Sequence, residues 1–182
     1  AGIVAHMTAI ADATDRPLMM YNIPGRTGTR IEIEALVELA EHPGIVAVKD
    51  AVDEAEWSGR ALEALPDGFA VYSGSDGHTR RIVEANGVGV VSVTSHLAGR
   101  EVSAMVSAVI EGDDTTAKEL DDLITPLTTA LFSEPNPMPL KAGLTKYWDH
   151  VGDPKLPLLP AKPETLELIG AALDTIAEYR AS

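Results

Sequence analysis

The chain has 182 residues, of which 45% are hydrophobic, and its 14 Lys and Arg against 28 Asp and Glu give a net charge of −14. This composition predicts a folded domain with a substantial core, and the negative charge argues against a nucleic-acid partner. No residue is a cysteine, which excludes disulfides, a thiol nucleophile and a thiolate zinc site, so a cytoplasmic location is the default expectation.

The first part of the chain alternates between two kinds of segment. Short apolar runs rich in β-branched residues predict strands, and the segments between them have helical spacing. The expected strands span residues 17–23, 44–49, 69–74 and 88–94, and the expected helices between them span 31–41, 56–65 and 76–85. This order predicts an α/β fold with a parallel sheet covered by helices, either a (β/α) barrel or an open doubly wound sheet.

After residue 94 the pattern becomes helical only, which predicts a helical C-terminal extension. The expected helices span residues 100–110, 115–132, 138–151 and 162–181. A complete barrel needs eight strands and about 250 residues, so if this sheet belongs to a (β/α)₈ barrel, its four strands are the C-terminal half and an N-terminal portion lies outside this sequence. On that interpretation we expect a partial barrel over residues 1–96, and the last barrel helix with the helical extension over 97–182.

Three further features limit the class of protein. No run of about twenty apolar residues and no signal-peptide pattern occurs, so we expect neither a spanning helix nor a leader. The five histidines show neither i, i+4 pairing nor a nearby carboxylate pattern, which predicts no metal site. P-loop and GxSxG motifs are absent, and Gly87 and Gly89 precede a strand instead of following one, which argues against a dinucleotide fingerprint.

Lys49 is the most unusual position in the expected sheet, because it ends an otherwise apolar strand. By alternation it shares a face with Ile45 and Ala47. A structural interpretation is a strand-end lysine that reaches water or pairs with Asp50 or Asp53. A catalytic interpretation is that desolvation leaves part of the lysine as neutral amine, able to attack a ketone carbonyl at the carboxyl end of a parallel strand.

Two residues of the segment YNIPGRTG, residues 21–28, are candidates for roles beside Lys49. Tyr21 ends the preceding strand, so its phenol would lie one strand away and could relay protons, or simply pack. Pro24 and Gly25 predict a loop after it. Arg26 in that loop could hold a carboxylate through its planar fork, or be a solvated surface cation.

Five segments together resemble the dihydrodipicolinate synthase and N-acetylneuraminate lyase group of class I aldolases. They are YNIPGRTG (21–28), GIVAVKDA (44–51), YSGSDG (72–77), GVGVVSVT (87–94) and EPNPMPLK (134–141). They occur in the order and at the spacing of that family, and they extend over the whole chain.

The resemblance implies a (β/α)₈ barrel with a helical C-terminal domain and imine chemistry without a metal or organic cofactor. By this resemblance Lys49 forms a Schiff base with pyruvate, Tyr21 transfers protons, and Arg26 binds the carboxylate of L-aspartate 4-semialdehyde. Gly74 and Val91 match positions that line the pyruvate pocket. The implied reaction is an aldol-type condensation followed by cyclisation, in lysine and diaminopimelate biosynthesis, by an enzyme that is a homotetramer in the family.

Two alternatives stay open from the sequence. One is a sister aldolase that cleaves sialic acid or another keto-sugar acid, against which the Arg26-Thr27-Gly28 triplet argues. The other is a half-barrel without catalysis, or one that needs a partner chain, because the family's N-terminal half supplies the threonine pair for the pyruvate carboxylate and a second tyrosine.

Overall fold

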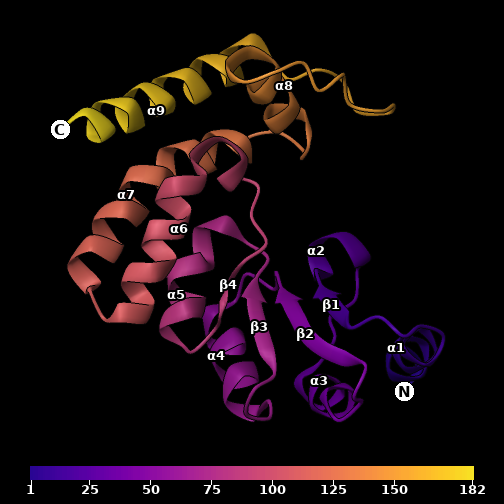
Figure 1. Cartoon of the computed structure of the whole chain (residues 1–182). Helices are drawn as coiled ribbons and strands as arrows, with labels where there is room; N and C mark the ends of the chain where they lie inside the picture. The colour runs from indigo at the N-terminus through magenta and orange to yellow at the C-terminus, as the bar shows by residue number, and fades with distance from the viewer. The chain divides into compact units, whose positions relative to one another are not determined.

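A computed structural model describes residues 1–182, apart from the side chain of Ala55, as two compact units, 1–91 and 92–182. The first is an α/β unit (Figure 1) with the elements α1 (Gly2–Asp12), β1 (Leu18–Asn22), α2 (Pro24–Thr27), α3 (Ile33–Ala40), β2 (Ile45–Asp50), α4 (Ala55–Ala64), β3 (Ala70–Ser73), η1 (Asp76–His78), α5 (Thr79–Glu84) and β4 (Gly89–Val90). The second is helical, with α6 (Ser95–Glu111), α7 (Asp114–Leu131), α8 (Met138–Tyr147) and α9 (Pro163–Ala181). The predicted fold class, four parallel strands with helices followed by a helical part, is confirmed.

The four strands form one sheet in the order β1-β2-β3-β4, and every neighbouring pair is parallel. One face packs against α3, α4 and α5 and forms the core of the unit, which contains Met20, Val48, Val71, Leu36, Leu39, Trp57 and Ile82. Apolar residues on alternate strand positions and on one stripe of each helix produce this arrangement. The opposite face is more open, since Met19 and Tyr21 are 44% and 39% exposed.

The residues of β2 that share a face of the sheet with Lys49 differ from those predicted. Leu18 pairs with Ile45 but the next residue, Met19, pairs with Ala47, so β2 contains one extra residue, Val46, as a bulge. Such an insertion changes which residues face the core. Ile45 joins Leu18 on the helix side, whereas Ala47 and Lys49 lie on the open face. The expectation that Ile45 shares the face of Lys49 was therefore wrong.

Several element boundaries also differ from the predictions. The segment after Tyr21 is not only a loop, because Pro24 starts the short helix α2 and Gly28, at φ 70°, ends it in the left-handed conformation. The fourth strand is only two residues long. Helix α8 ends at Tyr147, four residues early, because Trp148 leaves the helical conformation. Helix α6 begins five residues early and has a kink at Ala98.

The helical unit has its own core, in which Met105, Leu127, Leu131 and Ile169 are fully buried. A forked ion pair links its first and last helices: Arg180 donates from Nε and Nη2 to the two oxygens of Glu101, at 2.7 and 2.8 Å. The Glu101 side chain is buried, and its hydrogen bonds to Arg180 lower the pKa of its carboxyl. Among the described helices of both units, none is long and apolar enough to cross a membrane.

We predict that Arg180→Ala destabilises the helical unit by about 1–3 kcal/mol at pH 7, because it leaves a buried carboxylate unpaired. The lowered pKa means that the contribution is present above about pH 4.5 and is lost as the pH falls through the folded-state value. Urea unfolding at pH 7 and pH 3 measures both effects. Lys118→Ala, which breaks the exposed pair with Asp122, is the control; an equal loss in both variants would contradict the prediction.

Candidate active site

A row of side chains crosses the open face of the sheet near the carboxyl ends of the strands. The parallel pairing aligns Tyr21 with Lys49, Lys49 with Tyr72, and Tyr72 with Gly89. Residues in register on neighbouring strands point to the same face. The carboxyl end of a parallel sheet is where α/β proteins bind their ligands, so this row defines the candidate site.

The lysine and the tyrosine in this row are in direct contact. The Lys49 Nζ atom lies 4.2 Å from the centroid of the Tyr21 ring, within the range of a cation–π interaction. Asp50 faces the other side of the sheet, and Asp53 contacts Nδ1 of His78 at 3.4 Å. Neither of the carboxylates considered as structural partners therefore pairs with Lys49. The amine contacts a phenol ring on an accessible face.

Gly74 and Val91 occupy the neighbouring strand ends. Gly74 lies against the stem of Lys49, since a Cβ atom there would lie 3.0 Å from Lys49 Cγ and 2.9 Å from the Cβ of Ala51. Its N–H donates to the carbonyl of Asp50. Val91 follows β4 directly, donates its N–H to the carbonyl of Ser73 at 2.9 Å, and is 40% exposed. Gly74 thus allows close approach to Lys49, and Val91 lies at the end of the last strand of the sheet.

Arg26 lies in α2, on the segment that leaves the strand of Tyr21. Its side chain is exposed and makes no hydrogen bond or ion pair within the described part of the chain. The turn that holds it is stabilised by Thr27, whose hydroxyl lies 3.0 Å from the carbonyl of Ile23 and 2.8 Å from that of Thr29. The structure therefore places Arg26 on a defined turn with its donors available to a ligand.

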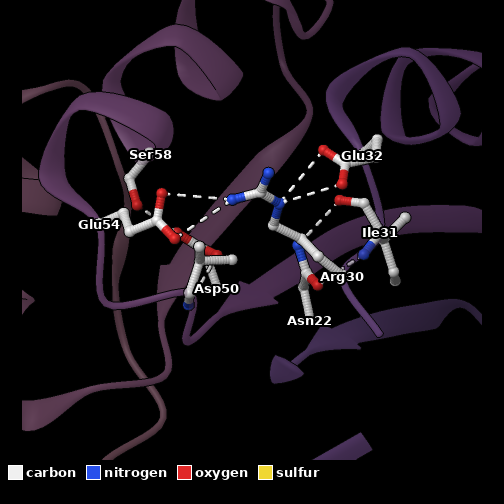
Figure 2. Close-up of polar contacts among 8 residues, drawn as sticks. Asn22, Arg30, Ile31, Glu32, Asp50, Glu54 and Ser58 are labelled. Carbon is white, nitrogen blue, oxygen red and sulfur yellow. Dashed lines mark hydrogen bonds and ion pairs between the residues drawn. The ribbon is translucent and has the colours of Figure 1, made fainter. Parts of the chain in front are cut away.

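Two buried polar side chains lie behind the row, on the helix side of the sheet (Figure 2). Asn22 and Asp50 are paired in register, one residue after Tyr21 and Lys49. The amide of Asn22 bonds both the N–H and the carbonyl of Ile31, at 2.9 and 3.1 Å. Asp50 accepts from the Ser58 hydroxyl at 2.5 Å and from the Val52 N–H at 3.3 Å. These anchors hold the loops that follow the two strands.

The sequence interpretation missed both anchors, since it considered Asp50 only as a partner for Lys49. Burial raises the pKa of the Asp50 carboxyl, and the hydrogen bond from Ser58 opposes that effect. An available signal was the alternation of β2, which puts an acidic residue next to the lysine on the opposite face. No group of three or more His, Asp or Glu side chains that could hold a metal ion occurs among the described residues.

Two cavities of similar size occur, and the residues that line them distinguish the two. A cavity of about 350 Å³ is lined by Tyr21, Thr27, Thr29, Ile31 and residues of α1 that include His6. A cavity of about 360 Å³ in the helical unit is lined by α8, the segment after it and Leu166 of α9, with none of the predicted site residues. Because the first cavity borders Tyr21 and the turn of Arg26, it is the better candidate for substrate access.

The sequence of the chain matches known proteins over most of its length. The model of the dihydrodipicolinate synthetase family matches residues 1–176. A curated relative, 4-hydroxy-tetrahydrodipicolinate synthase of Exiguobacterium sibiricum, is 44% identical over 159 residues, which cover 87% of this chain and 54% of the relative. The relative from Thermosynechococcus vestitus is 42% identical over 176 residues, which cover 96% of this chain and 60% of the relative.

Solved structures agree with the sequence relatives. The 4-hydroxy-tetrahydrodipicolinate synthase of Methylacidiphilum fumariolicum has a TM-score of 0.93 at 36% identity, with 99% of this chain and 60% of that chain covered. The chain therefore belongs to the dihydrodipicolinate synthetase family, as the sequence motifs predicted. It spans little more than half the length of the curated relatives it matches.

We predict that Gly74→Ala disturbs the site, because the added methyl group would overlap Ala51 and the stem of Lys49. Overpacking of this kind costs about 1–3 kcal/mol. Thermal unfolding measures the loss. Gly77→Ala in the short helix η1 that follows is the matched control, since its Cβ would meet nothing within 4 Å. Equal melting temperatures for the two variants would contradict the prediction.

Proposed function

We propose that this chain carries the Schiff-base centre of a pyruvate-dependent lyase that condenses pyruvate with L-aspartate 4-semialdehyde to give 4-hydroxy-tetrahydrodipicolinate. The observation that supports it most directly is the contact of Lys49 with Tyr21, with Nζ 4.2 Å from the ring centroid on the open face of the sheet. Family membership supports the same reaction class. Lysine and diaminopimelate biosynthesis, a cytoplasmic location and a homotetramer belong to the same proposal.

The first step of the proposed reaction is attack of the neutral Lys49 amine on the C2 ketone of pyruvate. The resulting carbinolamine loses water to form an imine, and loss of a C3 proton then gives an enamine. The phenol of Tyr21 is both a donor and an acceptor, which suits it to carry protons to and from the departing hydroxyl. Gly74 provides space for the lysine stem beside this centre.

In the second step, C3 of the enamine attacks the aldehyde carbon of L-aspartate 4-semialdehyde. Formation of the carbon–carbon bond turns the aldehyde oxygen into a hydroxyl. The substrate amino group then attacks the imine carbon, which closes the ring and releases the Lys49 amine. Arg26 is suited to hold the carboxylate of this substrate, because it is exposed, makes no internal pair among the described residues and has a planar fork. The Tyr21 cavity of about 350 Å³, which borders its turn, offers the space.

The imine step has a direct test. Incubation with pyruvate followed by borohydride is expected to add one reduced pyruvate to the wild type, and peptide mapping is expected to place it on Lys49. Lys49→Arg keeps the charge but cannot form the imine, so the adduct should vanish; Lys118→Ala should retain it. Tyr21→Phe should slow its formation by about 10²–10⁴-fold, the usual worth of a general acid–base group. An adduct that persists in Lys49→Arg would refute the assignment.

Recognition of the second substrate has a separate test. Arg26→Ala is expected to raise the KM for L-aspartate 4-semialdehyde about tenfold or more, because a charge-assisted pair is worth about 1.5–3 kcal/mol. The pyruvate adduct should be unaffected. Arg100→Ala, which removes an exposed arginine of α6, is the control. If Arg26→Ala left this KM unchanged, or if a sugar acid were cleaved in preference, the substrate assignment would be wrong.

A further inference from the structure

Arg30 joins the two loops that follow the candidate catalytic strands. Its Nε atom lies 3.1 Å from Glu32 Oε2, and its Nη1 atom lies 3.3 Å from both carboxylate oxygens of Glu54. Glu32 is the N-cap residue of α3, and Glu54 is the N-cap residue of α4. Figure 2 shows the guanidinium of Arg30 between these two carboxylates. One side chain therefore connects the segment after β1 to the segment after β2.

The guanidinium also rests on a buried aromatic ring. Its Cζ atom lies 5.5 Å from the centroid of the Trp57 ring, and Trp57 is only 2% exposed. Single exposed ion pairs contribute little to stability. A planar cation that contacts two carboxylates and lies over an indole ring has several partners at once, and its side chain loses less freedom for each contact. Arg30 itself is half-buried. This geometry makes it a candidate for a defined connection.

Each loop that Arg30 contacts is tied to one residue of the lysine–tyrosine pair. On one side, Arg30 precedes Ile31. The side chain of Asn22, the neighbour of Tyr21, bonds both the N–H and the carbonyl of Ile31. On the other side, Glu54 is the N-cap residue of α4, and α4 carries Ser58, which bonds Asp50, the neighbour of Lys49. The buried anchors fix each loop to its own strand, and Arg30 joins the loops.

We propose that Arg30 is a positioning residue that couples the loop carrying Arg26 to the loop that follows Lys49. It touches no substrate; it acts by holding the turn of residues 24–29 at a fixed distance from the start of α4. The effect on chemistry rests on the proposed function, whereas the mechanical coupling does not. Small displacements of a positioned group cost large factors in rate, so the connection matters although it lies outside the row of reacting groups.

Hydrogen exchange of the full chain tests the coupling. In Arg30→Ala, the backbone amides of residues 23–31 and of residues 51–57 are expected to exchange several-fold faster together. Glu54→Gln should affect both segments in the same way, and the double variant should exchange no faster than either single variant. Glu56→Gln, which removes a neighbouring exposed charge of α4 outside the Arg30 contacts, is the matched control. Faster exchange confined to one segment in Arg30→Ala would overturn the coupling.

The rate of borohydride trapping tests the positioning role. Arg30→Ala is expected to lower the maximal rate of adduct formation about threefold to tenfold, within the range for a misplaced group. The pyruvate concentration at half-maximal rate should not change, since Arg30 contacts no substrate. A maximal rate equal to that of the wild type would overturn the role. If the wild type forms no adduct, the proposed function fails, and the exchange experiment alone decides the coupling.

Discussion

The parallel pairing of β1 with β2 is the constraint on which the candidate site depends. It aligns Tyr21 with Lys49 on the open face, and Asn22 with Asp50 on the face that packs against helices. Because side chains alternate along a strand, a shift of one residue in either strand would exchange the two rows. The bulge at Val46 makes this register compatible with the core, since it lets Ile45 face the helices while Lys49 faces the open side.

The buried side chains of Asn22 and Asp50 explain how the loops after β1 and β2 can hold a defined geometry. A buried amide or carboxylate is costly unless its hydrogen bonds are satisfied, so Asn22 and Asp50 strongly favour the conformations that satisfy them. Their partners are Ile31 and Ser58, which lie beyond each strand end. The same hydrogen bonds that remove a desolvation cost therefore also determine where the loops run, and Arg30 joins those loops on the outside.

Much of the fold could be predicted because its signals are local. Apolar β-branched runs and helical spacing located the strands and most helices to within a few residues, and the motifs around Lys49 and Tyr21 indicated the family. The features that differ from the prediction depend on context. The fourth strand was predicted over residues 88–94 but is only two residues long, and so short a strand has no period to show; the turn of helix at Pro24 depends on Gly28 adopting a positive φ.

The sequence by itself determined the α/β alternation, the lysine at a strand end and the tyrosine one strand earlier, because each is encoded by neighbouring residues. Only the tertiary structure decided which face Ile45 occupies, since a bulge is defined by the partner strand. The tertiary structure also brought Arg30 into contact with Glu54, although the two residues lie 24 positions apart in the sequence. Such contacts depend on how separate elements pack together, and no local pattern along the chain records that.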